Sequence, residues 1–396
     1  MIAPTAVRYD GRTSEIFGLS LRVGFLTLIT IGIYRFWATT RVRRWFWSRI
    51  TIDDQRLEYS GTGFELFVAF VKVALVLVVV LIPLRLAETF YNFAGIISLA
   101  QLLLLGLLYV LGGYYARRYR LTRTQWHGIR ANLVGSSLDY LKLNVGYLLL
   151  TAVTLGVAYP YYRIATRGYL LDHTCFGDQK FSCTARARSL MGRWLIYVVV
   201  GLVLLGFLGL QVRDLALAQK GGPTPATSGA AVAGLVGASF LAVLVLGLCF
   251  IAYRAAEFRV LADSVTFQNV RVSSNLGAGR MMLFALKMCG AAFLWMIALG
   301  VVFAIGGLVL WHGLGIATLS VAGKVSLAIT LSLALLVSLP LLAISVFVRT
   351  YHNGLLRRAV ASLSFEGALD PARIGQTRDP IPRWGEGILE AFDFAG

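Results

Sequence analysis

The sequence predicts an all-α membrane protein, a polytopic bundle of six to eight transmembrane helices built from degenerate internal repeats and joined by short cytoplasmic β-hairpins. Of its 396 residues, 58% are hydrophobic and only 14% are charged. Soluble domains carry about 25% charged residues, so this chain has too little polar surface for a soluble protein. Several apolar runs also reach the ~20 residues that a helix needs to cross a hydrocarbon core.

The apolar runs give the predicted number of spans. Six are convincing, and they cover residues 64–86, 93–116, 194–212, 230–253, 283–310 and 325–348. Two further runs, residues 19–37 and 141–161, would raise the number to eight.

These two further runs are copies of one repeated element. Residues 154–157 (Thr-Leu-Gly-Val) repeat the pattern of residues 30–33 (Thr-Ile-Gly-Ile), and the polar segment 176–181 repeats the segment 52–57. On this basis we predict a first membrane repeat at 1–116, a second at 117–253, a divergent third at 254–348, and a cytoplasmic tail at 349–396.

Basic residues cluster in the loops between the runs. Cytoplasmic loops carry an excess of Lys and Arg, and the loop that follows residue 161 is strongly basic, although simple alternation of eight crossings would place it outside. Every strongly basic loop becomes cytoplasmic if residues 19–37 and 141–161 each dip into the membrane and return, or lie along its inner surface. The sequence leaves crossing and re-entry open.

A series of short polar signals separates the membrane segments. Each is an apolar or aromatic residue followed by a dipeptide that favours a tight hairpin turn. Isolated hairpins are marginal in water, so we expect them to pair into one cytoplasmic β layer. The turn at Gly177-Asp178 should place Cys175 opposite Lys180. The signals are Tyr9-Asp10-Gly11, Ile52-Asp53-Asp54, Trp126-His127-Gly128, Phe176-Gly177-Asp178, Phe267-Gln268-Asn269 and Phe365-Glu366-Gly367.

A family resemblance is sharpest over the first 70 residues. It is carried by Phe17-Gly18, by the segment 30–34 (Thr-Ile-Gly-Ile-Tyr) with Trp37 and Arg41 after it, and by the segment 57–62 (Leu-Glu-Tyr-Ser-Gly-Thr). In these residues the chain resembles the YjgN-like family of bacterial multi-pass inner-membrane proteins, a family of unknown function. The resemblance implies a multi-pass protein of the bacterial cytoplasmic membrane and supplies no activity.

Catalytic motifs are absent from the sequence. It contains no phosphate-binding loop, no His-Glu-x-x-His metal helix and no nucleophile elbow. His173, Cys175 and Cys183 match no zinc spacing, and free cysteine usually packs as a small hydrophobic residue. We therefore predict no enzyme activity, no catalytic residues, no metal site and no cofactor.

Polar residues inside the apolar runs are candidates for a polar pathway. Lys72 and Gln101 lie well inside their runs, and an ionisable residue within a membrane suggests function. Lys142 and Lys287 lie near the starts of their runs, where a lysine can extend its ammonium to the headgroups. For Lys72, too, such snorkelling remains an alternative.

The formal net charge of +18 is concentrated in the loops beside the spans. Topology and anionic lipid explain it, and no nucleic-acid motif accompanies it, so we predict lipid and not nucleic acid as the partner. The oligomeric state stays open. The candidate contacts to lipid headgroups are Arg41, Arg43, Arg44, Arg163 and Arg167.

Two functional hypotheses follow. In the first, which the repeats favour, the protein is a transporter or channel whose repeated elements are the discontinuous helices typical of carriers. In the second, it is a non-catalytic membrane scaffold that binds anionic lipid or a cytoplasmic partner. The scarcity of acidic residues in the membrane favours the second.

Overall fold

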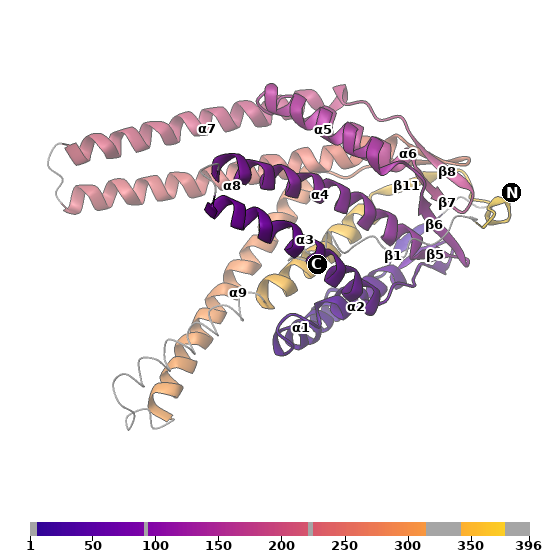
Figure 1. Cartoon of the computed structure of the whole chain (residues 1–396), viewed down its shortest axis with the longest axis horizontal. Coiled ribbons are helices and arrows are strands. Elements are labelled where there is room, and N and C mark those ends of the chain that lie inside the picture. The colour runs from indigo at the N-terminus through magenta and orange to yellow at the C-terminus, as the bar shows by residue number, and fades with distance from the viewer. Residues whose placement is uncertain (1–5, 91–93, 221–224, 314–341, 377–396) are drawn as a thin grey trace.

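The computed structural model describes residues 6–90, 94–220, 225–313 and 342–376. Helices fan out from a layer of short strands that lies at one end of the molecule (Figure 1). The predicted helical membrane architecture is confirmed, but the designation all-α is wrong because the hairpins join into a sizeable sheet.

Long helices dominate the described residues. Five segments are long and apolar enough to cross a membrane, namely Gly63–Glu88, Gly95–Thr122, Arg188–Leu217, Val232–Asp263 and Ala278–Ala298. They correspond to five of the six convincing runs. Most of the sixth, residues 325–341, lies outside the described residues. The helices are α1 (Thr13–Ile29), α2 (Arg35–Ser48), α3 (Gly63–Phe90), α4 (Ala94–Thr122), α5 (Ser137–Val153), α6 (Tyr159–Asp172), α7 (Arg188–Lys220), α8 (Pro225–Asp263), α9 (Ala278–Gly313) and a helix over residues 342–361.

The strands pair as the turn signals predict, but they form two sheets and not one, which together are called the β layer; its cytoplasmic position stays a prediction. One sheet has three strands in the order β1-β2-β3, and the other has eight in the order β11-β10-β9-β8-β7-β6-β5-β4. The strands are β1 (Val7–Tyr9), β2 (Ile50–Ile52), β3 (Gln55–Arg56), β4 (Glu58–Tyr59), β5 (Thr124–Trp126), β6 (Ile129–Leu133), β7 (Thr174–Phe176), β8 (Gln179–Cys183), β9 (Val265–Phe267), β10 (Val270–Ser274) and β11 (Leu363–Glu366).

Two-residue turns join four of the strand pairs, at Asp53-Asp54, His127-Gly128, Gly177-Asp178 and Gln268-Asn269. The first residue of each turn has a positive φ, as the turn dipeptides predict. Cys175 pairs with Lys180 in the predicted register. The signals at Tyr9-Asp10-Gly11 and Phe365-Glu366-Gly367 are different, because the first leads into α1 and the second ends β11.

Every helical unit leaves the β layer and returns to it. The pair α3–α4 lies between β4 and β5, the pair α7–α8 between β8 and β9, and the shorter pairs α1–α2 and α5–α6 lie between β1 and β2 and between β6 and β7. The far ends of α1 and α5 stop well short of the far end of the α7–α8 hairpin (Figure 1). Both short pairs therefore begin and end at strands of the β layer.

Neither residues 19–37 nor residues 141–161 form one continuous helix. Both α1 and α5 have 17 residues, a length of about 25 Å, and each ends at a sharp break before the next helix. A threonine hydroxyl stabilises each break, because it accepts a hydrogen bond from the backbone N–H of the residue four positions later. Thr30 accepts from Tyr34 at 2.9 Å, and Thr154 accepts from Ala158 at 3.1 Å. Positive φ angles occur at Ile31 (50°), Gly32 (87°), Leu155 (48°) and Gly156 (89°).

The buried hydrophobic clusters of the described residues lie mainly in the part of the helices near the β layer. Buried clusters there contain Ile16 with Phe46, and Trp194 with Tyr253. By contrast, in an apolar 18-residue stretch of each of the five membrane-capable segments, between 0% and 17% of the residues are buried. An apolar helix that is exposed on all sides is stable in hydrocarbon and not in water. These helices therefore present their side chains to lipid.

Candidate functional site

The two residues of the predicted polar pathway lie at different levels. Lys72 is exposed on α3, and Gln101 is 7% exposed on α4, where its Nε2 atom has no hydrogen-bond partner. Counted along the helices from the β-layer end, Lys72 lies about 14 Å and Gln101 about 32 Å away. The structure does not bring the two side chains together, and the polar-pathway assignment stays a prediction.

Replacing Gln101 by leucine should leave the stability of the protein unchanged or raise its free energy of unfolding by up to ~1 kcal/mol. A buried amide nitrogen without a partner carries a desolvation cost, and leucine removes it at similar volume. Thermal unfolding in detergent measures the effect. The isosteric Gln101→Glu variant should be destabilised instead. A loss of stability in Gln101→Leu as large as in Gln101→Glu would mean that the amide has a needed partner.

The basic residues of α2 lie on its outer face. Arg41 and Arg44 are exposed and Arg43 is half-buried. Arg43 donates to the hydroxyl of Tyr59 at 3.3 Å, and Arg44 donates to the carbonyl oxygen of Gly61 at 2.8 Å. These contacts fix the arginine side chains beside β4. The exposed guanidinium groups of Arg41 and Arg44 remain accessible to an anion.

The basic residues of α6 take part in a buried charge cluster with α8. Arg163 forms an ion pair with Glu257 at 2.8 Å, Arg254 binds the other oxygen of the same carboxylate, and Glu257 is 2% exposed. Burial lowers the pKa of the Arg167 guanidinium, and the positive charges of Arg163 and Arg254 lower it further. Desolvation disfavours the charged form of a buried guanidinium, and the neighbouring arginines add to this effect. The headgroup role of Arg163 and Arg167 stays a prediction.

Glu257 is the residue of this cluster that the sequence analysis missed. The apolar run at 230–253 ends before it, whereas α8 continues to Asp263. Its signal in the sequence is an acidic residue three positions after Arg254, on the same helical face. Among the described residues, no group of three or more His, Cys, Asp or Glu side chains could hold a metal ion.

Comparison with known proteins identifies the family. Residues 4–302 match the model of a family of bacterial proteins of unknown function (DUF898). The chain belongs to this family. It is also similar to the inner membrane protein YjgN of Salmonella typhimurium (strain LT2), with 34% identity over 80 residues. That match spans 20% of each chain, and no solved structure matches. The DUF898 chain described here is a multi-pass protein of the bacterial inner membrane, as the resemblance implied.

Proposed function

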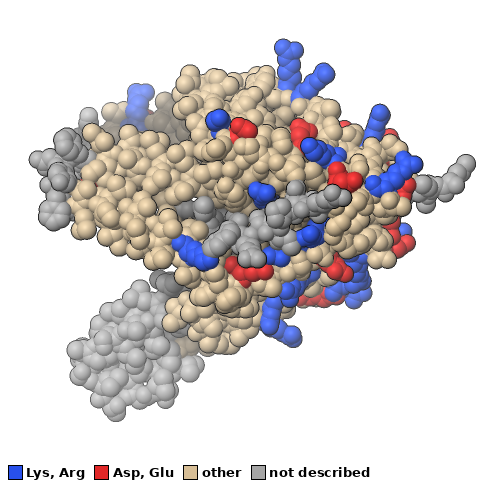
Figure 2. All heavy atoms as spheres, turned by 45° about the vertical axis from the view of Figure 1, so that its right-hand side comes forward, with Lys and Arg blue, Asp and Glu red and all other residues tan. Residues whose placement is uncertain are grey.

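We propose that this DUF898 protein is a non-catalytic membrane scaffold that binds anionic phospholipid through basic residues near its β layer. The proposal rests on one observation: the apolar surface of the long helices and the basic surface near the β layer lie in different parts of the molecule. The membrane-capable helices are almost entirely exposed and apolar, whereas the face shown in Figure 2 carries most of its Lys and Arg toward the β-layer end. Basic residues beside membrane spans attract anionic lipid.

The same proposal places the β layer in the cytoplasm. Cytoplasmic loops are rich in Lys and Arg, and all the helical units return to this layer. The pairs α1–α2 and α5–α6 then enter the membrane from the cytoplasm and return without crossing it. Their matching breaks and matching φ angles support an origin from one repeated element.

A hollow beside α6 fits a lipid molecule in this orientation. It has a volume of about 610 Å³. Leu143 and Tyr147 line it on α5, Arg186 lines it just before α7, and Arg188 lines it at the first residue of α7. Asp172 lies at the same polar end, where its carboxylate accepts the backbone N–H of Cys183 at 2.6 Å. The hollow therefore offers apolar side chains to an acyl chain and two arginines to a headgroup phosphate.

The double variant Arg41→Gln with Arg44→Gln should weaken binding of phosphatidylglycerol about thirtyfold, because each basic side chain near the headgroups contributes ~1 kcal/mol. Native mass spectrometry of the purified protein, titrated with phosphatidylglycerol, measures the affinity. The matched control is Arg8→Gln with Arg271→Gln, which removes the same charge from strands β1 and β10 of the layer itself and leaves the arginines of helix α2 in place. If both double variants lose the same affinity for phosphatidylglycerol, only the net charge of the protein matters. That result would contradict a specific lipid-binding surface at Arg41 and Arg44.

A carrier is the second candidate function. The two broken helix pairs favour it, because discontinuous helices form the substrate sites of many transporters. The low burial of the membrane-capable segments argues against it, since a transport path across the bilayer needs helices that enclose it. Solute flux into proteoliposomes above the rate of empty liposomes would favour the carrier over the scaffold.

A further inference from the structure

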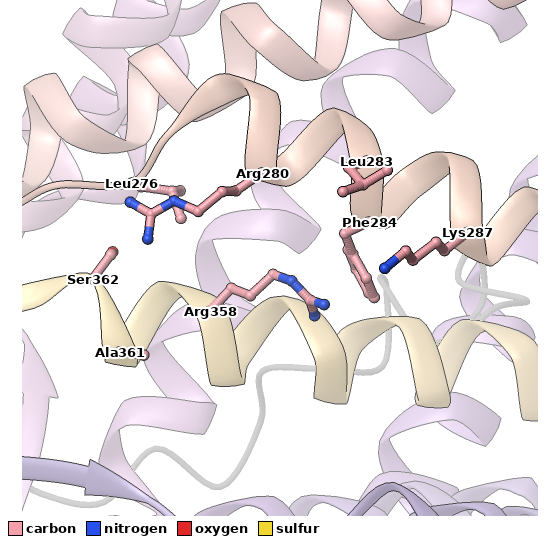
Figure 3. Close-up of a pocket in the computed structure, with 8 residues that line it drawn as sticks. All are labelled: Leu276, Arg280, Leu283, Phe284, Lys287, Arg358, Ala361 and Ser362. Carbon is pink, nitrogen blue, oxygen red and sulfur yellow. The ribbon is translucent and has the colours of Figure 1, made fainter.

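A cavity lined by three cations lies between α9 and the 342–361 helix. It has a volume of about 300 Å³. Arg280 and Lys287 come from α9 and Arg358 from the opposite helix (Figure 3). None of the described residues that line the cavity is acidic. The remaining lining residues are Leu276, Leu283, Phe284, Ala361 and Ser362.

Arg358 is held in place by an aromatic ring. Its guanidinium carbon lies 3.7 Å from the centre of the Phe284 ring, and its Nη1 atom donates to the carbonyl oxygen of Gly354 at 2.9 Å. The Tyr351 ring also stacks on Phe284, with the two ring centroids 5.4 Å apart. A cation over an aromatic ring keeps its other N–H groups available to a ligand.

Lys287 and Arg358 extend toward each other around the edge of Phe284 (Figure 3). Burial lowers the pKa of the Arg358 guanidinium, with a further contribution from the positive charge of Arg357. Arg280 lies near the β-layer end of the cavity, where its Nη2 atom donates to the carbonyl oxygen of Asn275 at 2.6 Å. The described lining residues place three positive charges and no acid around the cavity; these charges repel one another, and a bound anion would offset that repulsion.

We propose that this cavity binds the phosphate group of an anionic phospholipid, a specific site that rests on the proposed lipid-binding function. Arginine and lysine form strong charge-assisted hydrogen bonds to phosphate. A lipid fits better than a soluble phosphate ester, because the cavity opens on a helix that is long and apolar enough to cross the membrane. Leu283 is 54% exposed beside it and offers a contact to an acyl chain.

The test uses two exposed side chains of the cavity. Arg280→Gln and Lys287→Gln each remove a charge without touching the buried Phe284 contact, so both variants should fold. We expect each to weaken binding of phosphatidylglycerol to the full-length protein at least tenfold by native mass spectrometry. Lys142→Gln is the matched control, because Lys142 is an exposed lysine near the start of α5 and does not line the cavity.

Each other outcome is informative. If the parent protein binds phosphatidylglycerol better than phosphatidylcholine but the cavity variants bind as the parent does, the site is wrong and the proposed function holds. If the parent protein does not distinguish the two lipids, the proposed function fails and the site fails with it. If millimolar inorganic phosphate displaces phosphatidylglycerol from the parent but not from the cavity variants, the ligand is a soluble phosphate and the lipid assignment is overturned.

Discussion

Replacing Glu257 by alanine should lower the free energy of unfolding by about 3 kcal/mol, because removing one partner of a buried ion pair leaves an uncompensated charge. Glu257 is 2% exposed and its carboxylate binds both Arg163 and Arg254. The variant leaves two guanidinium groups close together with no acid between them. Denaturant-induced unfolding in mixed micelles measures the change, and a lower melting temperature in detergent should accompany it.

Two further variants test whether the effect comes from the buried charges. Adding Arg163→Met to Glu257→Ala should recover part of the stability, because it removes one of the uncompensated charges. Glu58→Ala, at an exposed position of β4, should change stability by less than ~0.5 kcal/mol. If the double variant is less stable than Glu257→Ala alone, the pair does not act through charge compensation.

The ion pair between Arg163 and Glu257 also connects the short helix pair α5–α6 to the long hairpin α7–α8. Arg163 belongs to α6, which follows a helix break, and Glu257 belongs to α8, which is long enough to cross the membrane. A second contact supports the same junction, since the Trp194 indole on α7 donates to the carbonyl oxygen of Gly156 at 2.9 Å. The short pair α5–α6 is therefore fixed against the α7–α8 hairpin.

The β layer was predictable because turns are local. A dipeptide such as His127-Gly128 adopts positive φ for reasons contained in its own residues, so four hairpins could be placed from the sequence. The breaks at Thr30 and Thr154 were visible as a repeated pattern. Their geometry was not, since hydropathy averages over a break and joins the two short helices into one apparent span.

The cationic cavity and the Glu257 cluster could not be predicted because they depend on which helices meet. Arg280 and Arg358 are far apart in sequence and become neighbours only because β10 and β11 pair. Glu257 contacts Arg163 only because α6 packs beside α8. Such long-range contacts leave no periodic signal in a single sequence. Lys287 was recognised near the start of its run, but its cationic neighbours were not.

Cysteines placed on both sides of each short helix pair should all react from the cytoplasm. In a protein whose four native cysteines are replaced by serine, the positions are Ser14 and Ser60 around α1–α2, and Val134 and Ser189 around α5–α6. All four are exposed. Because both ends of each pair reach the β layer, an impermeant maleimide should label none of them in intact cells and all of them after permeabilisation.

The design depends on positions that accept a cysteine. Val134 is preferred to its neighbour Gly135, where an added Cβ would lie 2.9 Å from the ring of His173. Gly229, exposed on α8 with open space around it, is the positive control and should be labelled in intact cells. Labelling of Ser189 without Val134 would mean that residues 141–161 cross the membrane. The β layer would then be divided between the two sides of the membrane, and that result would contradict the pairing of β6 with β7.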